Sequence, residues 1–249
     1  QLIGHDDFAR SEYSTFLIPE AKLDELCRQA TFNGLQWGTR FQDLKISLYL
    51  VGGDDQERVE MAKRLESLVG PSLLVEGDVM PAQLLTDLLV ARGETISCAE
   101  SCTSGFIAKL LTDQSGSSAW FYGGAVTYAN EAKMAMLGVN EETLQIHGAV
   151  SEACVLEMAE GMLNRSHTDW ALSVSGIAGP DGGSNEKPVG TVWFGFASKH
   201  RSSMAVKVQL TSYGRDSVRR KASVVALILA SQYIKGACLL DTVKKWQYI

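Results

Sequence analysis

Residues 99–105 read Ala99-Glu100-Ser101-Cys102-Thr103-Ser104-Gly105, and this stretch joins a predicted strand to a predicted helix. Residues 94–98 are short and partly β-branched, which is typical of a buried strand. Residues 106–111 place three apolar side chains on one helical face. Because the first N–H groups of a helix lack partners inside it, the turn favours negative charge. The turn therefore has two interpretations, an ordinary helix cap or the seat of a nucleophile.

The composition is that of a globular protein with an acidic balance. Of the 249 residues, 45% are hydrophobic and 21% are charged, and the formal net charge is −6. A nucleic-acid surface needs clustered basic residues, and a membrane span needs about 20 consecutive apolar residues, so neither is expected. The five cysteines form no C-x-x-C pair and the four histidines lie far apart, which predicts neither a disulfide framework nor a metal site. A reducing cytoplasm is the expected location.

The first part of the chain, residues 1–77, is predicted to be a small α/β module. Residues 1–19 show no clear period and are expected to be irregular. Helical and strand periods then alternate, with a helix at 19–27, a strand at 43–51, a helix at 59–68 and a strand at 72–75. Gly77-Asp78 marks the boundary, and Asp78 is expected to cap a helix over 79–89.

The second part, residues 78–249, is predicted to be a three-layer α/β/α domain with a mixed sheet. Strands are expected near residues 95, 125, 172, 193 and 207, with helices between most of them. Gly123-Gly124 interrupts the second of these strands, which indicates a bulge or a close backbone approach. A long apolar helix is predicted over 218–234, and residues 237–249 form a second short helix or a loose end.

Two side chains are candidates for a nucleophile, and one lysine is a candidate for its base. Ser101 is inert at its free pKa and needs a base. Lys133, on a predicted helix over 130–137, can be that base if burial lowers its pKa, or it can be a solvated helix lysine. Tyr128 is either a core aromatic or a polar assistant. Cys102 competes with Ser101 because a helix start lowers a thiol pKa, although small buried cysteines are commoner.

A glycine-rich loop provides a second candidate binding element. Residues 175–183 follow a predicted strand and contain four glycines and a proline, which suits an anion cradle but also a long turn. Ligands of layered α/β sheets bind beyond the carboxyl ends of the strands, so this loop and 100–105 are expected to face one pocket. Arg215, at the start of the last long helix, can hold a phosphate as a fork or be a surface charge.

Together these stretches resemble the C-terminal domain of the CinA family, the competence/damage-inducible proteins that include nicotinamide mononucleotide deamidases. The motifs that carry the resemblance are Ala99-Glu100-Ser101-Cys102-Thr103, Gly105, Gly124, Val126-Thr127-Tyr128, Lys133, Gly148-Ala149-Val150-Ser151, Gly176-Ile177-Ala178-Gly179-Pro180, Gly182-Gly183, Lys187-Pro188-Val189-Gly190 and Arg215. The resemblance covers roughly residues 78–235. Residues 20–77 are similar to the small linker module of full-length CinA proteins, whose larger N-terminal domain has no counterpart in these 249 residues.

The resemblance implies hydrolysis of the carboxamide of nicotinamide mononucleotide to nicotinic acid mononucleotide and ammonia, without a metal or another cofactor. Ser101 is then the nucleophile, Lys133 its base and Tyr128 an assistant, and N–H groups near residues 102–105 hold the oxyanion. The expected substrate contacts are Glu100, Cys102, Thr103, Ser104, Gly105, Ser175, Gly176, Ala178, Gly179 and Arg215. A small-molecule nucleotide substrate and a homodimer are expected, with no nucleic-acid and no membrane partner.

Three positions depart from the family pattern. Ser104 stands where the family usually has glycine, Ser175 replaces the usual threonine, and Gly214 replaces the carboxylate of the usual Gly-Asp-Arg. These departures motivate an alternative hypothesis, a non-catalytic nucleotide-binding or assembly module of a CinA-like protein. Ammonia release from the nucleotide distinguishes the two hypotheses.

Overall fold

The computed structural model describes residues 9–70 and 72–246. The chain divides into two compact units, of which the first holds the described residues up to Met80 together with Lys244 to Trp246, and the second is Pro81–Val243. The expected boundary after residue 77 lies in the connection between the last strand of the first unit and the first helix of the second. None of the helices in the described part has both the length and the apolar character that a membrane span needs.

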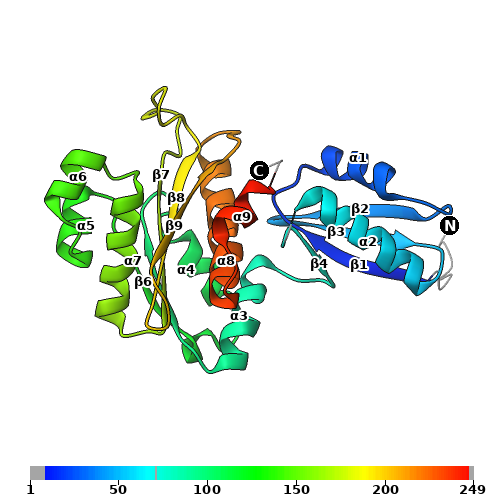
Figure 1. Cartoon of the computed structure of the whole chain (residues 1–249), viewed down its shortest axis with the longest axis horizontal. Coiled ribbons are helices and arrows are strands. Elements are labelled where there is room, and N and C mark those ends of the chain that lie inside the picture. The colour runs from blue at the N-terminus through cyan, green and yellow to red at the C-terminus, as the bar shows by residue number, and fades with distance from the viewer. Residues whose placement is uncertain (1–8, 71, 247–249) are drawn as a thin grey trace. The chain divides into compact units, whose positions relative to one another are not determined.

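The first unit is a four-stranded antiparallel sheet with two helices (Figure 1). The sheet has the order β2-β3-β1-β4, with β1 at Arg10–Thr15, β2 at Gln36–Gln42, β3 at Lys45–Val51 and β4 at Leu74–Glu76. The helices are α1 at Glu20–Ala30 and α2 at Asp55–Val69, and they bury Leu23, Leu26, Met61 and Leu65. A capping box between Asp54 and Glu57 begins α2.

The sequence-based prediction for this unit was incomplete. Residues 10–15 were expected to be irregular, and this was wrong: they form β1, an inner strand that pairs with both β3 and β4. Its last three residues are all buried, so the alternation of buried and exposed side chains that usually reveals a strand is missing there. Residues 1–8, which were also expected to be irregular, lie outside the described residues. β2 was also missed, since most of its side chains are exposed or half-buried and none is fully buried.

Asp78 does not cap the following helix, as the sequence had predicted. Its carboxylate instead forms an ion pair with the buried ammonium of Lys45, which compensates a charge that is otherwise costly to bury. The helix α3, at Pro81–Arg92, begins three residues later with proline in its first turn, where the missing N–H costs nothing.

The second unit contains a five-stranded mixed sheet of order β6-β5-β7-β8-β9. Its strands are β5 at Ile96–Glu100, β6 at Phe121–Val126, β7 at Trp170–Gly176, β8 at Thr191–Ser198 and β9 at Met204–Gln209. β5 is parallel to β6 and β7, whereas β8 is antiparallel to both of its neighbours. All five strands were predicted, and the expectation of a mixed sheet is confirmed.

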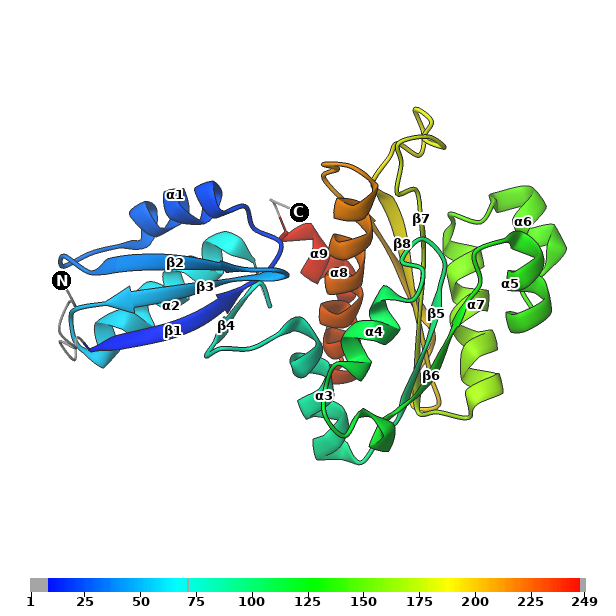
Figure 2. The same ribbon diagram turned by 180° about the vertical axis from the view of Figure 1, so that it is seen from behind.

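Helices cover both faces of this sheet, so the predicted three-layer α/β/α architecture is also confirmed (Figure 2). The helices of one face are α3, α4 at Phe106–Thr112 and α8 at Arg215–Lys235. Those of the other face are α5 at Asn130–Leu137, α6 at Glu141–His147, which was not predicted, and α7 at Glu152–Ser166. The short helix α9 occupies Leu239–Lys244.

The carboxyl ends of β5, β6 and β7 are held in register at one edge of the sheet. The Ser101 N–H donates to the Val174 carbonyl at 3.0 Å, and the Thr127 N–H donates to the Glu100 carbonyl at 2.8 Å. The predicted irregularity of β6 is confirmed: the register with β5 skips Tyr122. A Cβ on Gly124 would lie 2.5 Å from the sulfur of Cys98, so only glycine allows these two strands to approach so closely.

Gly161 permits a second close approach, between α7 and the end of α5. A Cβ at this position would lie 1.8 Å from the Leu137 carbonyl oxygen. We therefore expect Gly161→Ala to lower the free energy of unfolding by about 1–3 kcal/mol, although alanine in an open helix position stabilises by roughly 1 kcal/mol. Thermal unfolding measures the effect, with Glu160→Ala on the exposed neighbouring position as the control. A raised melting temperature for Gly161→Ala would contradict the proposed contact.

Candidate active site

The turn between β5 and α4 is organised by the buried carboxylate of Glu100. This side chain is 1% exposed, and its oxygens accept hydrogen bonds from the N–H groups of Gly105, Ile107 and Ala108 at 2.9, 3.1 and 2.8 Å. The carboxylate thus satisfies the free N–H groups at the start of α4 and compensates its own burial. Glu100, expected from the resemblance to contact substrate, is instead placed to shape the turn.

The turn does not use two of its own backbone N–H groups. The Ser104 N–H donates to the Ser101 carbonyl and the Gly105 N–H to Glu100. Within the described part of the chain, the N–H groups of Cys102 and Thr103 donate no hydrogen bond. Thr103 is 0% exposed and does not line the cavity described below, so the Cys102 N–H is the candidate oxyanion donor of the expected set at 102–105.

Ser104 has φ = 51° and is exposed on the outside of the turn. The left-handed conformation is the physical reason why glycine suits this position. The Ser104 hydroxyl donates to the Ser101 carbonyl at 3.3 Å, and its side chain does not line the cavity described below. The serine therefore leaves the space in front of Ser101 open.

Lys133 and Ser101 lie within hydrogen-bond distance in the second unit. The Lys133 Nζ is 3.1 Å from the Ser101 Oγ, and it also donates to the carbonyls of Thr127 and Tyr128 at 2.8 and 3.1 Å. Lys133 is 1% exposed and Ser101 is 7% exposed. The junction between β6 and α5 supplies both carbonyls, so one connection fixes the position of the amine.

These three contacts match the requirements of a general base. A neutral amine has two N–H bonds and one lone pair. When the two carbonyls accept the N–H bonds, the lone pair faces the Ser101 hydroxyl, from which it can take the proton. The same nitrogen, once protonated, donates to all three oxygens.

Burial lowers the pKa of Lys133 below its usual value of 10.5. Desolvation is the main cause, because it disfavours the charged form. The thiols of Cys154 and Cys102 and the carboxylate of Glu131 oppose this effect and raise the pKa. Lys133 is therefore neutral over a wider pH range than a solvated lysine.

Cys102 is less suited to be the nucleophile than the sequence suggested. Its side chain is 4% exposed, and burial raises the pKa of its thiol to about 12. The helix start was expected to lower this pKa, but the loss of solvent outweighs that effect. The thiolate, which is the reactive form, is scarce at neutral pH.

A cavity of about 260 Å³ opens in front of the Ser101–Lys133 pair. Its lining consists of Ser101, Cys102, Tyr128, Lys133, Ala149, Val150, Ser175, Gly176, Ala178 and Arg215. Five of the expected contact residues do not line it: Glu100, Thr103, Ser104, Gly105 and Gly179. Ala149 and Val150 were missed as site residues, although they belong to one of the motifs that carry the family resemblance.

Two contacts join the walls of this cavity. The Ser175 hydroxyl donates to the Ala149 carbonyl at 2.7 Å. Arg215 donates from Nη1 to the Gly179 carbonyl at 2.9 Å and from Nη2 to the Tyr128 hydroxyl oxygen at 2.6 Å. The guanidinium thus lies between the glycine-rich loop and the β6–α5 junction. Tyr128 contacts Lys133 through its backbone carbonyl and Arg215 through its hydroxyl.

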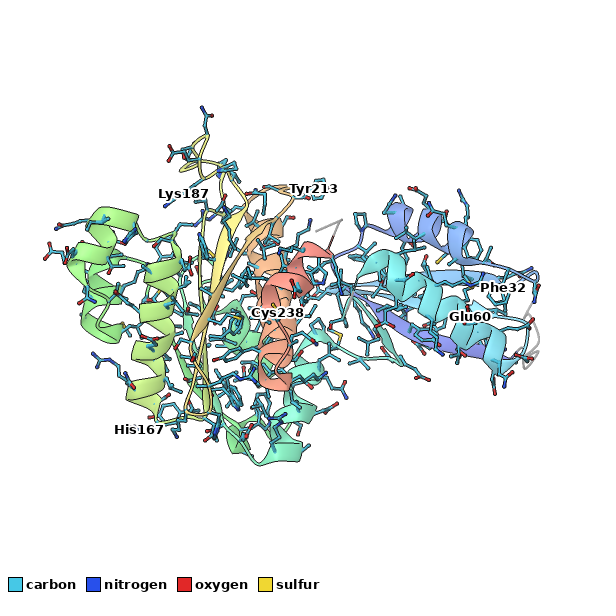
Figure 3. All side chains as sticks on the ribbon, in the orientation of Figure 1. Phe32, Glu60, His167, Lys187, Tyr213 and Cys238 are labelled. Carbon is cyan, nitrogen blue, oxygen red and sulfur yellow. The ribbon has the colours of Figure 1, made fainter. Side chains whose placement is uncertain are left out.

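Figure 3 shows the end of the sheet at which the site lies. The loops that carry Lys187 and Tyr213 extend from this end, and His167, before β7, lies at the opposite end. Lys187 donates to the His147 carbonyl at 2.9 Å, so the segment that follows the glycine-rich loop is tied to the end of α6. The expectation that the loops 100–105 and 175–183 flank one pocket agrees with the lining residues that each contributes.

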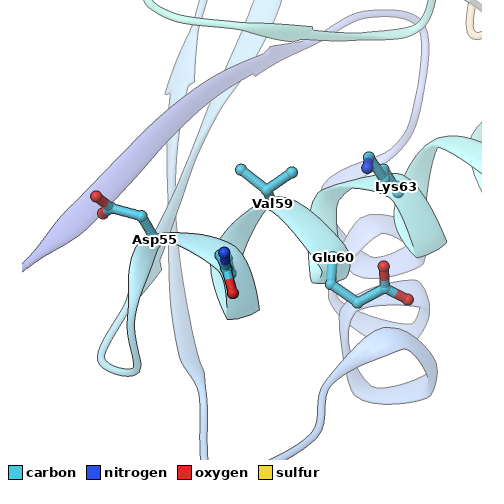
Figure 4. A pocket seen from close by; sticks show the side chains of 5 residues that line it. Asp55, Val59, Glu60 and Lys63 are labelled. Atoms are coloured by element: carbon cyan, nitrogen blue, oxygen red, sulfur yellow. The ribbon is translucent and has the colours of Figure 1, made fainter.

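A second hollow, of about 430 Å³, lies on the first unit (Figure 4). All its lining residues come from α2: Asp55, Gln56, Val59, Glu60 and Lys63. Among these five side chains, no hydroxyl or thiol faces a base, and Val59 is 43% exposed. This surface therefore does not offer the chemistry of the cavity in the second unit.

Comparisons with known proteins agree with this architecture. A family model described as the CinA C-terminal domain matches residues 80–234. The nicotinamide-nucleotide amidohydrolase PncC of Escherichia coli K12 is 59% identical over 139 residues, which are 56% of this chain and 84% of that protein. A putative competence-damage inducible protein of Thermoanaerobacter pseudethanolicus is 36% identical over 230 residues, covering 89% of this chain and 55% of that protein.

The solved structures lead to the same family. The crystal structure of a CinA superfamily protein from Klebsiella pneumoniae is 36% identical, with a TM-score of 0.60, and the match covers 63% of this chain and 96% of that chain. The family model spans more than half of the present sequence. The chain therefore belongs to the CinA family, through a CinA C-terminal domain that includes the cavity and its Ser101–Lys133 pair.

Proposed function

We propose that the chain is a nicotinamide-nucleotide amidohydrolase, which converts nicotinamide mononucleotide and water to nicotinic acid mononucleotide and ammonia. Relatives of 56–59% identity carry the name nicotinamide-nucleotide amidohydrolase PncC. The observation that carries the mechanism is the contact between the Lys133 Nζ and the Ser101 Oγ at 3.1 Å. It provides a nucleophile and a base with a lowered pKa in one cavity.

The first half of the reaction forms an acyl-enzyme. The Ser101 oxygen adds to the carboxamide carbon while its proton passes to the Lys133 nitrogen. The electron pair of the C=O double bond moves to the carboxamide oxygen, which the N–H group of Cys102 stabilises. When the tetrahedral intermediate collapses, the C–N bond breaks and Lys133 returns the proton to the leaving nitrogen, which departs as ammonia.

The second half regenerates the enzyme. Water adds to the ester carbon and gives a proton to Lys133, and the same N–H group holds the second oxyanion. The Ser101 oxygen then leaves with the proton from Lys133, and the carboxylic acid product loses its own proton to solvent. The sum is one amide and one water converted to one acid and one ammonia.

The nicotinamide ring of the substrate is proposed to bind in the cavity and its phosphate at the cavity rim. A volume of about 260 Å³ is at the lower end of ligand pockets, which begin near 300 Å³, and it suits the nicotinamide ring. Arg215 at the rim exchanges its contacts with the Gly179 carbonyl and Tyr128 for the phosphate, which a guanidinium binds as a fork. Ser175, through its bond to Ala149, keeps the opposite wall in place.

The first unit is proposed to be the CinA linker module, because the relative from Thermoanaerobacter pseudethanolicus aligns over 89% of this chain. The homodimer and the cytoplasmic location stay predictions. Light scattering of the purified protein tests the dimer, and a mass of one chain would contradict it.

Replacing the nucleophile tests the proposed function directly. We expect Ser101→Ala to lower ammonia release from nicotinamide mononucleotide at least about 10³-fold, since the covalent step is lost. Ser104→Ala, which removes a hydroxyl from the outside of the same turn, serves as the control and retains turnover. Unchanged activity of Ser101→Ala would exclude the serine mechanism, and loss of activity in Cys102→Ser alone would favour the thiol. Binding of nucleotide without any turnover by the wild type would favour the non-catalytic module.

The lowered pKa of Lys133 predicts two pH effects. Activity rises with pH through the Lys133 pKa, below 10.5, because only the neutral amine accepts the proton. Folding stability also rises between that pKa and about 10.4, the value for an unfolded lysine, because the unfolded chain then binds more protons. Lys133→Met should abolish turnover and remove this increment of stability, as measured by denaturant unfolding across pH. An identical stability–pH curve for Lys133→Met and the wild type would contradict the assignment.

Arg215 is expected to act in substrate binding. With nicotinamide mononucleotide, Arg215→Gln should raise KM about 10- to 100-fold, because a hydrogen bond to a charged group contributes about 1.5–3 kcal/mol, while kcat changes little. The riboside without its phosphate is the matched substrate. The wild type should prefer the phosphorylated compound, and Arg215→Gln should lose most of that preference. An undiminished preference in the variant would place the phosphate elsewhere.

A further inference from the structure

Helix α8 presents a second arginine, Arg219, one turn after Arg215. Residues four apart lie on the same helical face. Arg215 reaches the cavity rim, whereas Arg219 lies behind the nucleophile turn, where its Nη2 donates to the Thr103 carbonyl at 3.4 Å. This carbonyl belongs to the residue that follows Cys102, whose N–H group is the proposed oxyanion donor.

Some hydrogen-bonding groups at and around Arg219 lack a partner. Its Nε is buried without a hydrogen-bond partner in the described part of the chain, and so is the hydroxyl of Thr103, which is 0% exposed. The ion pairs among the described residues do not include Arg219. A half-buried guanidinium without a counter-charge is costly, so its position next to the reacting groups needs a physical reason.

The charge balance of the turn supplies that reason. Glu100 is a buried carboxylate only one residue before Ser101, and its negative charge opposes the formation of another negative charge nearby. Lys133 is neutral when it acts as the base. Burial is the main cause of the raised pKa of Cys102, but Glu100 raises it further, and Lys133 and Arg219 lower it. With Lys133 neutral, Arg219 is the cation among these groups that offsets Glu100.

We propose that Arg219 is a positioning residue for the amidase reaction, which holds the Thr103 carbonyl from behind and favours the oxyanion bound by the N–H group of Cys102. The inference rests on the proposed function. The charge that Arg219 favours forms on the carboxamide oxygen, as the Ser101 oxygen bonds to the carbon and its proton moves to Lys133. Arg219 touches neither substrate nor base, and it acts through the backbone of Thr103 and through its field.

The test compares kcat and KM for ammonia release from nicotinamide mononucleotide. Loss of one direct oxyanion donor lowers kcat about 10²–10³-fold. Because Arg219 acts only indirectly, through the Thr103 backbone, we expect a smaller effect. Arg219→Gln should lower kcat roughly 10- to 100-fold and change KM less than about threefold. Arg219→Lys keeps the charge but loses the fork, so it should recover part of kcat. The matched control is Arg165→Gln, since the Arg165 Nη2 makes a similar contact to the Ala135 carbonyl, 3.3 Å away on the other face.

Each result decides the matter. A KM increase at unchanged kcat, or wild-type kinetics of Arg219→Gln, would overturn the inference while the proposed function stands. A wild type without Ser101-dependent ammonia release would overturn both. If Arg219→Gln does not fold, Arg219→Lys carries the test: a lowered kcat at unchanged KM and melting temperature supports the role, and an unchanged kcat rejects it.

Discussion

The architecture of the site depends on the placement of one amine. Lys133 is buried with its nitrogen bound to two carbonyls and one hydroxyl, and an ammonium in that position loses most of its solvation. Burial therefore lowers the pKa, and the two carbonyls from the β6–α5 junction fix the direction of the lone pair. In the proposed mechanism, a serine that is inert in water thereby acquires a base without a histidine.

The scaffold maintains this placement by close backbone packing. Gly124 allows β6 to approach β5, and Gly161 allows α7 to approach the end of the helix that carries Lys133. The Glu100 carboxylate accepts hydrogen bonds from three N–H groups at the start of α4. These bonds shape the turn that carries Ser101. This arrangement buries a negative charge next to Ser101, and in the inference above the guanidinium of Arg219, behind Thr103, offsets that charge.

The sheet of the second unit was predicted completely because its pattern is regular, whereas in the first unit two helices and two strands were predicted and two strands were missed. Buried apolar strands alternating with amphipathic helices gave the three layers and the five strands of the mixed sheet. β1 escaped prediction because its last three residues are all buried and show no alternation, and β2 because none of its side chains is fully buried. The sequence offered Ser101 and Lys133 as candidates for nucleophile and base, and the family resemblance favoured that pair, whereas their contact depends on tertiary geometry. The roles of Glu100 and Arg219 could not be deduced, because sequence spacing does not reveal which N–H groups or carbonyls a side chain reaches.

The titration of the Lys133 side chain in the intact protein tests the central claim most directly. Nuclear magnetic resonance of the lysine Nζ, assigned by comparison with Lys133→Met, measures this pKa without reference to turnover. The account predicts a midpoint for Lys133 below 10.5 and below those of the exposed lysines. A midpoint at or above that of the exposed lysines would mean that Lys133 holds Ser101 as an ammonium, and would contradict its assignment as the base.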